Sequence, residues 1–93
     1  MKVNCLIWDK WNVVHIARHE VTPDEVEEIC QGDHISEKGY SGRLRLVGYT
    51  QKGRALGVVL VPKGDDIFYP VTARPASRKE RKKYLGTKGG EAK

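Results

Sequence analysis

Long apolar runs are absent from this sequence: no stretch approaches the roughly 18 consecutive apolar residues typical of a membrane-spanning helix. The first residues do not form the apolar core of a signal peptide, so neither membrane insertion nor secretion is expected. Cysteine is also scarce, because Cys5 and Cys30 stand alone and no C-x-x-C pair is present. We therefore expect reduced thiols in a cytoplasmic protein, not a disulfide or a metal knuckle.

The chain has room for a single domain, because its 93 residues cannot form two hydrophobic cores. We assign that domain to residues 1–85 and expect residues 86–93, which lack apolar anchors, to be a disordered tail. Residues 1–37 hold three basic and eight acidic side chains, whereas residues 38–93 hold fourteen basic and four acidic ones. The net charge of +5 therefore predicts a polyanionic partner, bound by the second half of the chain. A solvated basic face without a ligand is the alternative.

The first part of the chain predicts a strand and two helices. The apolar run from Val3 to Ile7 is typical of a strand, and Asp9 can cap a helix that runs to about His19. That helix has a broad apolar side, which we expect to be buried, and a narrow polar stripe. The apolar side is Trp11, Val13, Val14 and Ala17, and the stripe is Asn12, His15 and His19.

The second helix has the clearest start signal in the sequence. Thr22 and Glu25 form a T-x-x-E capping box, Pro23 occupies the first helical position, and Gly32 is a suitable terminator. Its outer face is acidic, so we do not expect it to contact nucleic acid.

From residue 34 onward the apolar pattern alternates, which predicts an antiparallel sheet of three to four strands. Pro70 cannot donate a ladder hydrogen bond, so its strand should lie at an edge or contain a bulge. The loop of residues 39–43 leaves Tyr40 and Arg43 available to a ligand. The expected strands are His34–Lys38, Leu44–Tyr49, Ala55–Val61 and Asp66–Ala73, with turns at residues 51–53 and 62–65.

A last helix is predicted from a second capping box, Ser77 with Glu80, to about Leu85. Five of its residues are basic, and cations in a first turn oppose the helix dipole. The free backbone N–H groups of the first turn, together with Arg78 and Lys79, would suit a phosphate. A phosphate site therefore explains why these cations lie at a position that helix formation alone does not favour.

His15 and His19 lie four residues apart, a spacing that can bind zinc when a third ligand such as Asp9 or His34 is added. No H-E-x-x-H motif is present, and we predict no metal site. Two histidines hydrogen-bonded at the surface are the simplest interpretation. A general acid or base is a third one, since imidazole titrates near neutral pH.

Three arginines form a second candidate constellation. Arg45, Arg74 and Arg78 are expected to converge near the start of the last helix, where guanidinium groups could stabilise the charge of a phosphodiester. The structural alternative pairs Arg74 and Arg78 with Glu80 or with the acidic second helix. Aromatic side chains that could stack on a base are Trp8, Trp11 and Tyr49.

Two stretches resemble BrnT-family toxins. Trp8-Asp9 through Asn12, followed by the segment 17–21, is similar to the family's W-D opening and N-x-x-K-H-G-V helix end. The segment 72–84 resembles the family's S-A-R-x-A-[TS]-x-x-E-x-x-x-Y signature. The order and spacing of the elements also agree, so the resemblance covers residues 6–85.

The resemblance implies a RelE-like α+β fold with two N-terminal helices, an antiparallel sheet of three to four strands and a C-terminal helix. It also implies a metal-independent endoribonuclease without a cofactor, the toxin half of a type II toxin–antitoxin pair. Such an enzyme cleaves RNA through attack of the ribose 2′-OH on the adjacent phosphate. The implied partners are RNA and an antitoxin encoded by a neighbouring gene, with a homodimer or a hetero-oligomer both open.

Carried over position by position, the resemblance makes His19 the acid or base, and Arg45 and Arg74 the groups that stabilise the phosphate. Glu80 completes the expected catalytic set. The expected RNA contacts are Arg43, Arg78, Arg81, Lys82, Trp8 and Tyr49.

The sequence also departs from the family pattern. Glu20 replaces a glycine, Thr72 replaces a serine, and Pro75 follows the arginine. The acidic residue expected shortly before Arg45 is absent from the segment 40–44. A degenerate toxin that binds nucleic acid or its antitoxin without cleavage is therefore the alternative function.

Overall fold

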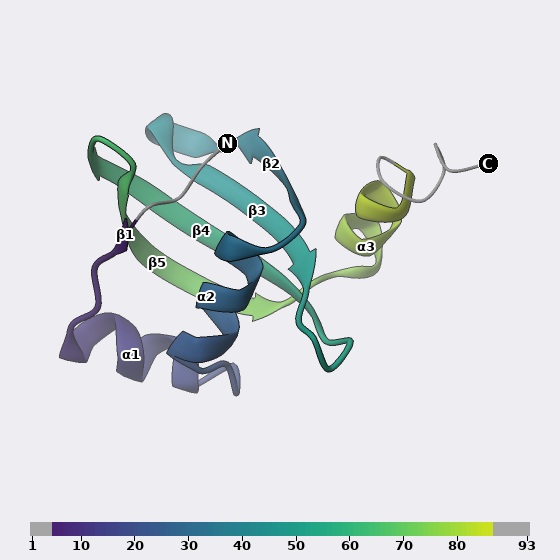
Figure 1. The fold of residues 1–93 in the computed structure, drawn as a ribbon, viewed down its shortest axis with the longest axis horizontal. Helices are drawn as coiled ribbons and strands as arrows, with labels where there is room; N and C mark the ends of the chain where they lie inside the picture. Colours follow the sequence, from purple (N-terminus) through teal and green to yellow (C-terminus); the bar gives the residue numbers. More distant parts are fainter. Residues whose placement is uncertain (1–4, 87–93) are drawn as a thin grey trace.

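The computed structural model describes residues 5–86, and these form an α+β fold with one five-stranded sheet (Figure 1). The α-helices are α1 (Lys10–Ala17), α2 (Pro23–Gln31) and α3 (Arg78–Tyr84), and a 3-10 turn, η1, covers Tyr40–Gly42. The strands are β1 (Cys5–Leu6), β2 (His34–Lys38), β3 (Leu44–Tyr49), β4 (Ala55–Gly64) and β5 (Ile67–Pro75). Most of the predicted tail, residues 87–93, lies outside the described residues.

The sheet is mixed and has five strands, so the prediction of an antiparallel sheet of three to four strands holds for β2 to β5 and omits β1. Its strand order is β1-β5-β4-β3-β2, and β1 runs parallel to β5, with Cys5 opposite Ile67 and Leu6 opposite Phe68. The other neighbours pair antiparallel. Strand β1 therefore adds to the edge of the sheet beside β5, and both N-terminal helices lie in the long connection that parallel pairing requires.

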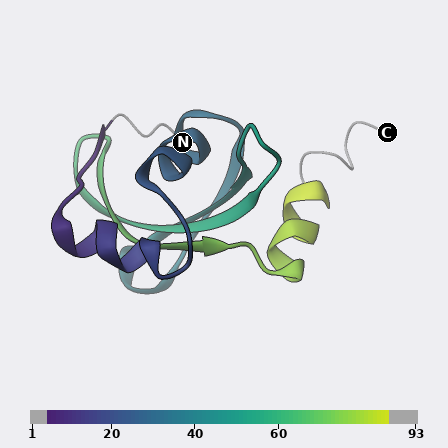
Figure 2. The ribbon, with the colours of Figure 1, turned by 90° about the horizontal axis from the view of Figure 1, so that it is seen from below.

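The hydrophobic core lies between the N-terminal helices and one face of the sheet. The sheet curves around α2 (Figure 2), which buries Val26, Ile29 and Cys30 against it. The side chains of the facing strands that complete this core include Leu46, Leu56, Val58, Leu60 and Ala73. Within residues 5–86, no helix is both long and apolar enough to cross a membrane.

Helix α1 is turned differently from the sequence prediction. Trp11 and Val14, expected on the buried side, are 60% and 49% exposed, whereas Asn12 is fully buried. The Asn12 side-chain amide donates hydrogen bonds to the backbone oxygens of Ile7 and Pro70, at 2.9 Å and 3.1 Å. Because these bonds satisfy a buried polar side chain and tie α1 to β5, the asparagine faces the sheet and the tryptophan faces outward.

The capping predictions are confirmed. Thr22 accepts a hydrogen bond from the Glu25 N–H at 3.2 Å, the Glu25 carboxylate accepts one from the Thr22 N–H at 3.0 Å, and Gly32 caps the end of α2. Ser77 and Glu80 form the same arrangement at α3. Both boxes are local patterns, so the sequence alone was sufficient to identify them.

The turn between β4 and β5 lies later than predicted, and the expected bulge at Pro70 is present. Strand β4 continues to Gly64, so the turn predicted at residues 62–65 lies later, where Asp66 has a φ of 57°. Between β4 and β5 the register passes from Val59 opposite Thr72 to Leu60 opposite Pro70. One extra residue therefore lies in β5 beside the proline, which is the predicted bulge.

Candidate functional site

Two rows of side chains cross the outer face of the sheet, the face turned away from the core helices. One row is Glu37, Arg45, Val59 and Thr72, and the next is Ile35, Val47, Gly57 and Arg74. Residues opposite each other on neighbouring strands point to the same side of a sheet, and so do residues two apart along one strand. The register therefore puts Arg45 and Arg74 on one surface, in adjacent rows.

Glu37 and Lys83 are two charged residues that the sequence did not identify as part of the site. The Glu37 carboxylate accepts hydrogen bonds from Arg45, through Nε at 3.1 Å and through Nη2, and from the Lys83 ammonium group of α3. The bonds from Lys83 and Arg45 hold the pKa of Glu37 below its usual value. An ionised carboxylate thus lies beside Arg45, although none is present in the segment 40–44.

A second carboxylate lies beside Arg74. Glu80, only 9% exposed, accepts a hydrogen bond from Arg74 Nη1 at 3.3 Å and another from the Ser77 N–H at 2.9 Å. This is the pairing that the structural alternative expected for Arg74. Glu80 can lie close to the sheet because Gly57 has no side chain: a Cβ there would be 3.2 Å from Glu80 Oε1.

The two pairs belong to one group, which we call the outer-face cluster: Glu37, Arg45, Arg74, Glu80 and Lys83. The pKa of Arg45 is raised, chiefly by its hydrogen bond to Glu37 and to a smaller extent by the charge of Glu80. Three cations therefore share two carboxylates on a surface where both arginines and the lysine remain partly exposed to solvent. Such a surface can bind a phosphate and also offers a proton acceptor beside it.

The predicted aromatic contacts lie in different places. Tyr49 lies against Tyr84 of α3, with the ring centroids 5.2 Å apart, and both side chains line a hollow together with Asp33 and acidic residues of α2. Trp8 is half-buried against the core, and its Nε1 donates a hydrogen bond to Glu27 at 3.0 Å. Trp8 is therefore held by α2, on the core side of the sheet.

The structure does not bring His19 into hydrogen-bond contact with either sheet arginine. Its exposed ring lies edge-on to His15, at a centroid distance of 6.0 Å, just after the end of α1. Its backbone oxygen accepts a hydrogen bond at 3.3 Å from Arg54, whose guanidinium also binds Glu25. Its assignment as acid or base stays a prediction.

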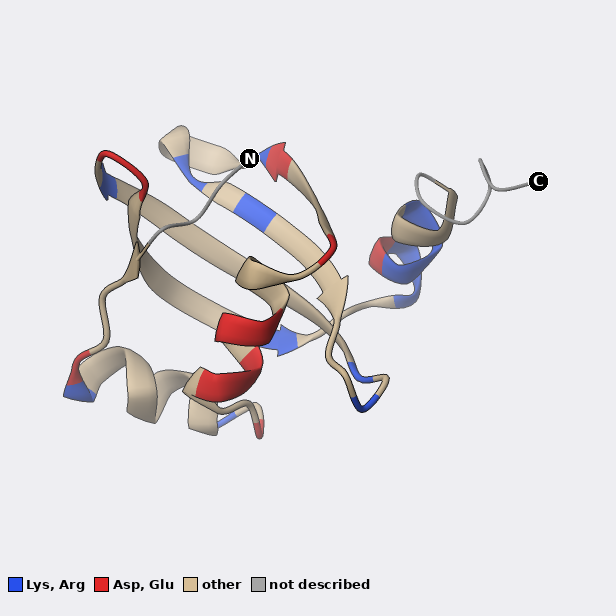
Figure 3. Cartoon of the chain, in the orientation of Figure 1, with Lys and Arg blue, Asp and Glu red and all other residues tan. Residues whose placement is uncertain are grey.

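The other predicted RNA contacts are exposed basic residues. Arg78, Arg81 and Lys82 lie on α3, and Arg43 directly precedes β3. Figure 3 shows basic residues on α3, on β3 and at the end of β5, and acidic residues along α2. Within residues 5–86 there is no group of three or more histidine, cysteine, aspartate or glutamate side chains suited to hold a metal ion.

Comparison of the sequence with models of protein families finds no matching family, and comparison with curated proteins finds no relative. The chemistry of the outer-face cluster is therefore the basis for the function.

Proposed function

We propose that this protein is a metal-independent endoribonuclease with a RelE-like fold, the toxin of a type II toxin–antitoxin pair. The observation that supports this most strongly is the outer-face cluster, in which the Glu37 carboxylate contacts Arg45 and Lys83 beside the Arg74–Glu80 pair. Cleavage through the ribose 2′-OH requires a proton acceptor, a proton donor and positive charge at the phosphate. The cluster contains all three kinds of group.

In the proposed reaction, Glu37 takes the proton of the 2′-OH as the hydroxyl oxygen attacks the adjacent phosphorus. A bond forms between that oxygen and phosphorus, and the bond from phosphorus to the 5′-oxygen breaks. Arg45 and Arg74 stabilise the charge that develops on the phosphate oxygens. Lys83 donates the proton that the leaving 5′-oxygen takes up. The products are a 2′,3′-cyclic phosphate and a 5′-hydroxyl.

Substrate binding improves the proton acceptor in this scheme. In the free protein, Lys83 and Arg45 lower the pKa of Glu37, which makes its carboxylate a weak base. An RNA phosphate competes for the same two cations. As they turn toward the phosphate, the carboxylate loses part of this stabilisation, and its pKa rises toward the range that suits a general base.

Two departures from the family pattern, the missing carboxylate before Arg45 and the replacement of a glycine by Glu20, are each offset by a feature of this fold. Glu37, across the β2–β3 pair, supplies the carboxylate that is missing from the segment 40–44. Glu20 replaces the glycine of the family motif, and its φ is 59°, in the left-handed region that glycine adopts most easily. The backbone there keeps a conformation suited to the glycine, which supports the resemblance.

A non-catalytic module that binds nucleic acid or an antitoxin is the second candidate. One observation favours it: Arg45 and Arg74 already have carboxylate partners within the chain, as structural ion pairs do. Binding would then fall to the exposed cations of α3, and no strand would be cut. An antitoxin encoded by a neighbouring gene is the partner of the toxin and of the antitoxin-binding module, whereas the nucleic-acid-binding module needs none.

Replacement of Glu37 separates the two candidates. RNA is incubated with the purified protein in excess chelator, and the Glu37→Gln variant is compared with an Asp65→Asn control in the exposed β4–β5 turn. Loss of a general base lowers the rate by roughly 10²- to 10⁴-fold, while the variant still binds RNA. Salt-dependent binding by the wild type without any cleavage supports the binding module instead. His19→Ala in the same assay shows whether that histidine takes part.

A further inference from the structure

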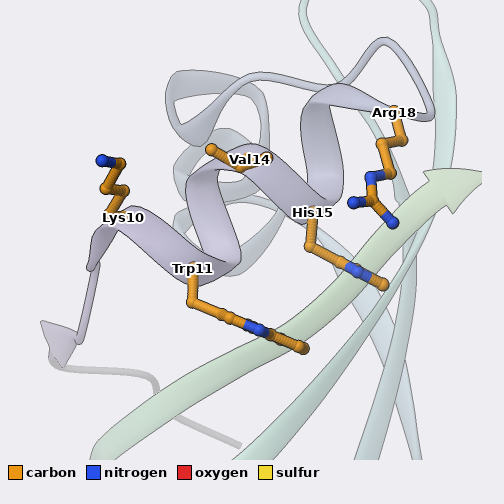
Figure 4. Close-up of a pocket in the computed structure, with 5 residues that line it drawn as sticks. All are labelled: Lys10, Trp11, Val14, His15 and Arg18. Atoms are coloured by element: carbon orange, nitrogen blue, oxygen red, sulfur yellow. The ribbon is translucent and has the colours of Figure 1, made fainter.

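The outward side of α1 forms a second surface, separate from the outer-face cluster. Trp11, Val14, His15, Arg18 and Lys10 line a hollow of about 410 Å³ (Figure 4). This surface exists because Asn12 and Ile16 face the sheet, which leaves Trp11, Val14 and Arg18 exposed to solvent and His15 half-buried.

Two aromatic rings form the centre of this hollow. The rings of Trp11 and His15 are stacked, with centroids 5.1 Å apart and planes only 5° from parallel. The Trp11 side chain is 60% exposed although it is the largest apolar group of α1. An exposed ring face, held in place by a parallel neighbour, is the kind of platform on which a nucleobase stacks.

The flanks of the hollow are positively charged. Lys10 and Arg18 lie at the two ends of α1, and within residues 5–86 neither forms an ion pair with a carboxylate. Residues 1–37 contain only three basic side chains in an otherwise acidic half, and two of them line this hollow. The charge therefore complements an anion at each end of the aromatic centre.

We propose that this side of α1 binds a single-stranded RNA segment, with a base stacked on Trp11 and the neighbouring phosphates bound by Lys10 and Arg18. The choice of RNA rests on the proposed function. A second copy of the chain fits less well. Antiparallel pairing of two α1 helices would bring the Lys10 of one copy to the Arg18 of the other, and these two positive charges would repel each other. An amphipathic helix also fits less well, because Val14 is the one aliphatic side chain among the lining residues.

The two surfaces are connected through β5. Asn12, on the sheet-facing side of α1, is hydrogen-bonded to the Pro70 oxygen of β5, and Arg74 lies four residues farther along that strand. Four strand residues span about 13 Å. This segment of β5 links α1 to the strand end that contributes Arg74 to the outer-face cluster.

A cleavage-resistant RNA tests this binding without relying on catalysis. A labelled 2′-O-methyl oligoribonucleotide is titrated with the wild type and with the Trp11→Ala, Lys10→Ala and Arg18→Ala variants, while Lys63→Ala at the far end of β4 is the control for loss of a cation. Trp11→Ala weakens binding by roughly five-fold to a hundred-fold. Each α1 cation variant lowers the slope of log K against log salt by about 0.7. The Lys63→Ala variant binds like the wild type.

Unchanged affinity of the Trp11→Ala variant overturns the inference, provided that circular dichroism shows it to be folded. Quenching of Trp11 by an acidic amphipathic peptide, but not by the oligonucleotide, overturns it in favour of a protein partner. The proposed function is tested separately from the α1 site. Wild-type protein that binds RNA through Trp11 but never cleaves it supports the α1 site and contradicts the nuclease function. Cleavage that is unaffected by Trp11→Ala supports the nuclease function and contradicts the α1 site.

Discussion

Asn12 joins α1 to the sheet, and we expect its replacement by alanine to lower the free energy of unfolding by about 3 kcal/mol. Its side-chain amide donates to the oxygens of Ile7 and Pro70, and its side-chain oxygen accepts from the Asp9 N–H at 2.9 Å. Each such bond contributes about 1 kcal/mol net, and a buried partner left unpaired costs about 1–3 kcal/mol. Alanine recovers about 0.5 kcal/mol through its better helix propensity.

Urea denaturation followed by circular dichroism measures this loss. Val14→Ala is a matched control on the exposed side of the same helix, and its effect should stay within about 0.5 kcal/mol of the wild type. Asn12→Asp keeps the acceptor for the Asp9 N–H but loses both donors and adds a buried charge, so it should destabilise more than alanine does. An Asn12→Ala variant within about 1 kcal/mol of the wild type would refute the orientation of α1 described above.

Two further predictions concern Gly57 and Cys30. Gly57→Ala puts a Cβ 3.2 Å and 3.3 Å from the Glu80 oxygens; it should displace that carboxylate from Arg74 and slow RNA cleavage, whereas Gly64→Ala, whose nearest neighbour is 3.9 Å away, should not. Burial, aided by the charge of Glu27, raises the pKa of Cys30 from 9.0 to about 12. The unfolded thiol ionises first as the pH rises, so stability should fall by up to about 1.4 kcal/mol per pH unit between these values. Alkaline urea titrations of the wild type and of Cys30→Val measure the difference; equal slopes would contradict the prediction.

The parts of the fold that the sequence predicted are those set by local chemistry. The Thr22–Glu25 and Ser77–Glu80 capping boxes involve neighbours three residues apart, and Pro70 acts on its own strand, so no knowledge of the fold was needed. The side of α1 that is buried could not be predicted in this way. Apolar periodicity favours Trp11 over Asn12 for the interior, and only the position of the Pro70 oxygen on β5 reverses that choice.

The candidate site was predicted only where local sequence patterns identified its residues. Alternation placed Arg45 on a strand, and the motif at the chain end placed Arg74 and Glu80 close together. Glu37 depends on the register of two strands: it faces Arg45 only because β2 pairs with β3 from His34 opposite Gly48 to Lys38 opposite Leu44. The short loop between β2 and β3 was the feature of the sequence that could have indicated their antiparallel pairing, and with it the position of Glu37. Lys83 depends on how α3 lies across the outer face, which the sequence does not specify.

The nature of the cleaved ends tests the central claim most directly. RNA is incubated with the purified protein in excess chelator, and the products are analysed by mass spectrometry. The outer-face cluster predicts fragments that end in a 2′,3′-cyclic phosphate and a 5′-hydroxyl, and a single 2′-deoxy substitution at the cleaved nucleotide should abolish that cut. Cleavage that requires a divalent metal ion, that persists at the 2′-deoxy position, or that is unaffected by Glu37→Gln would contradict the account.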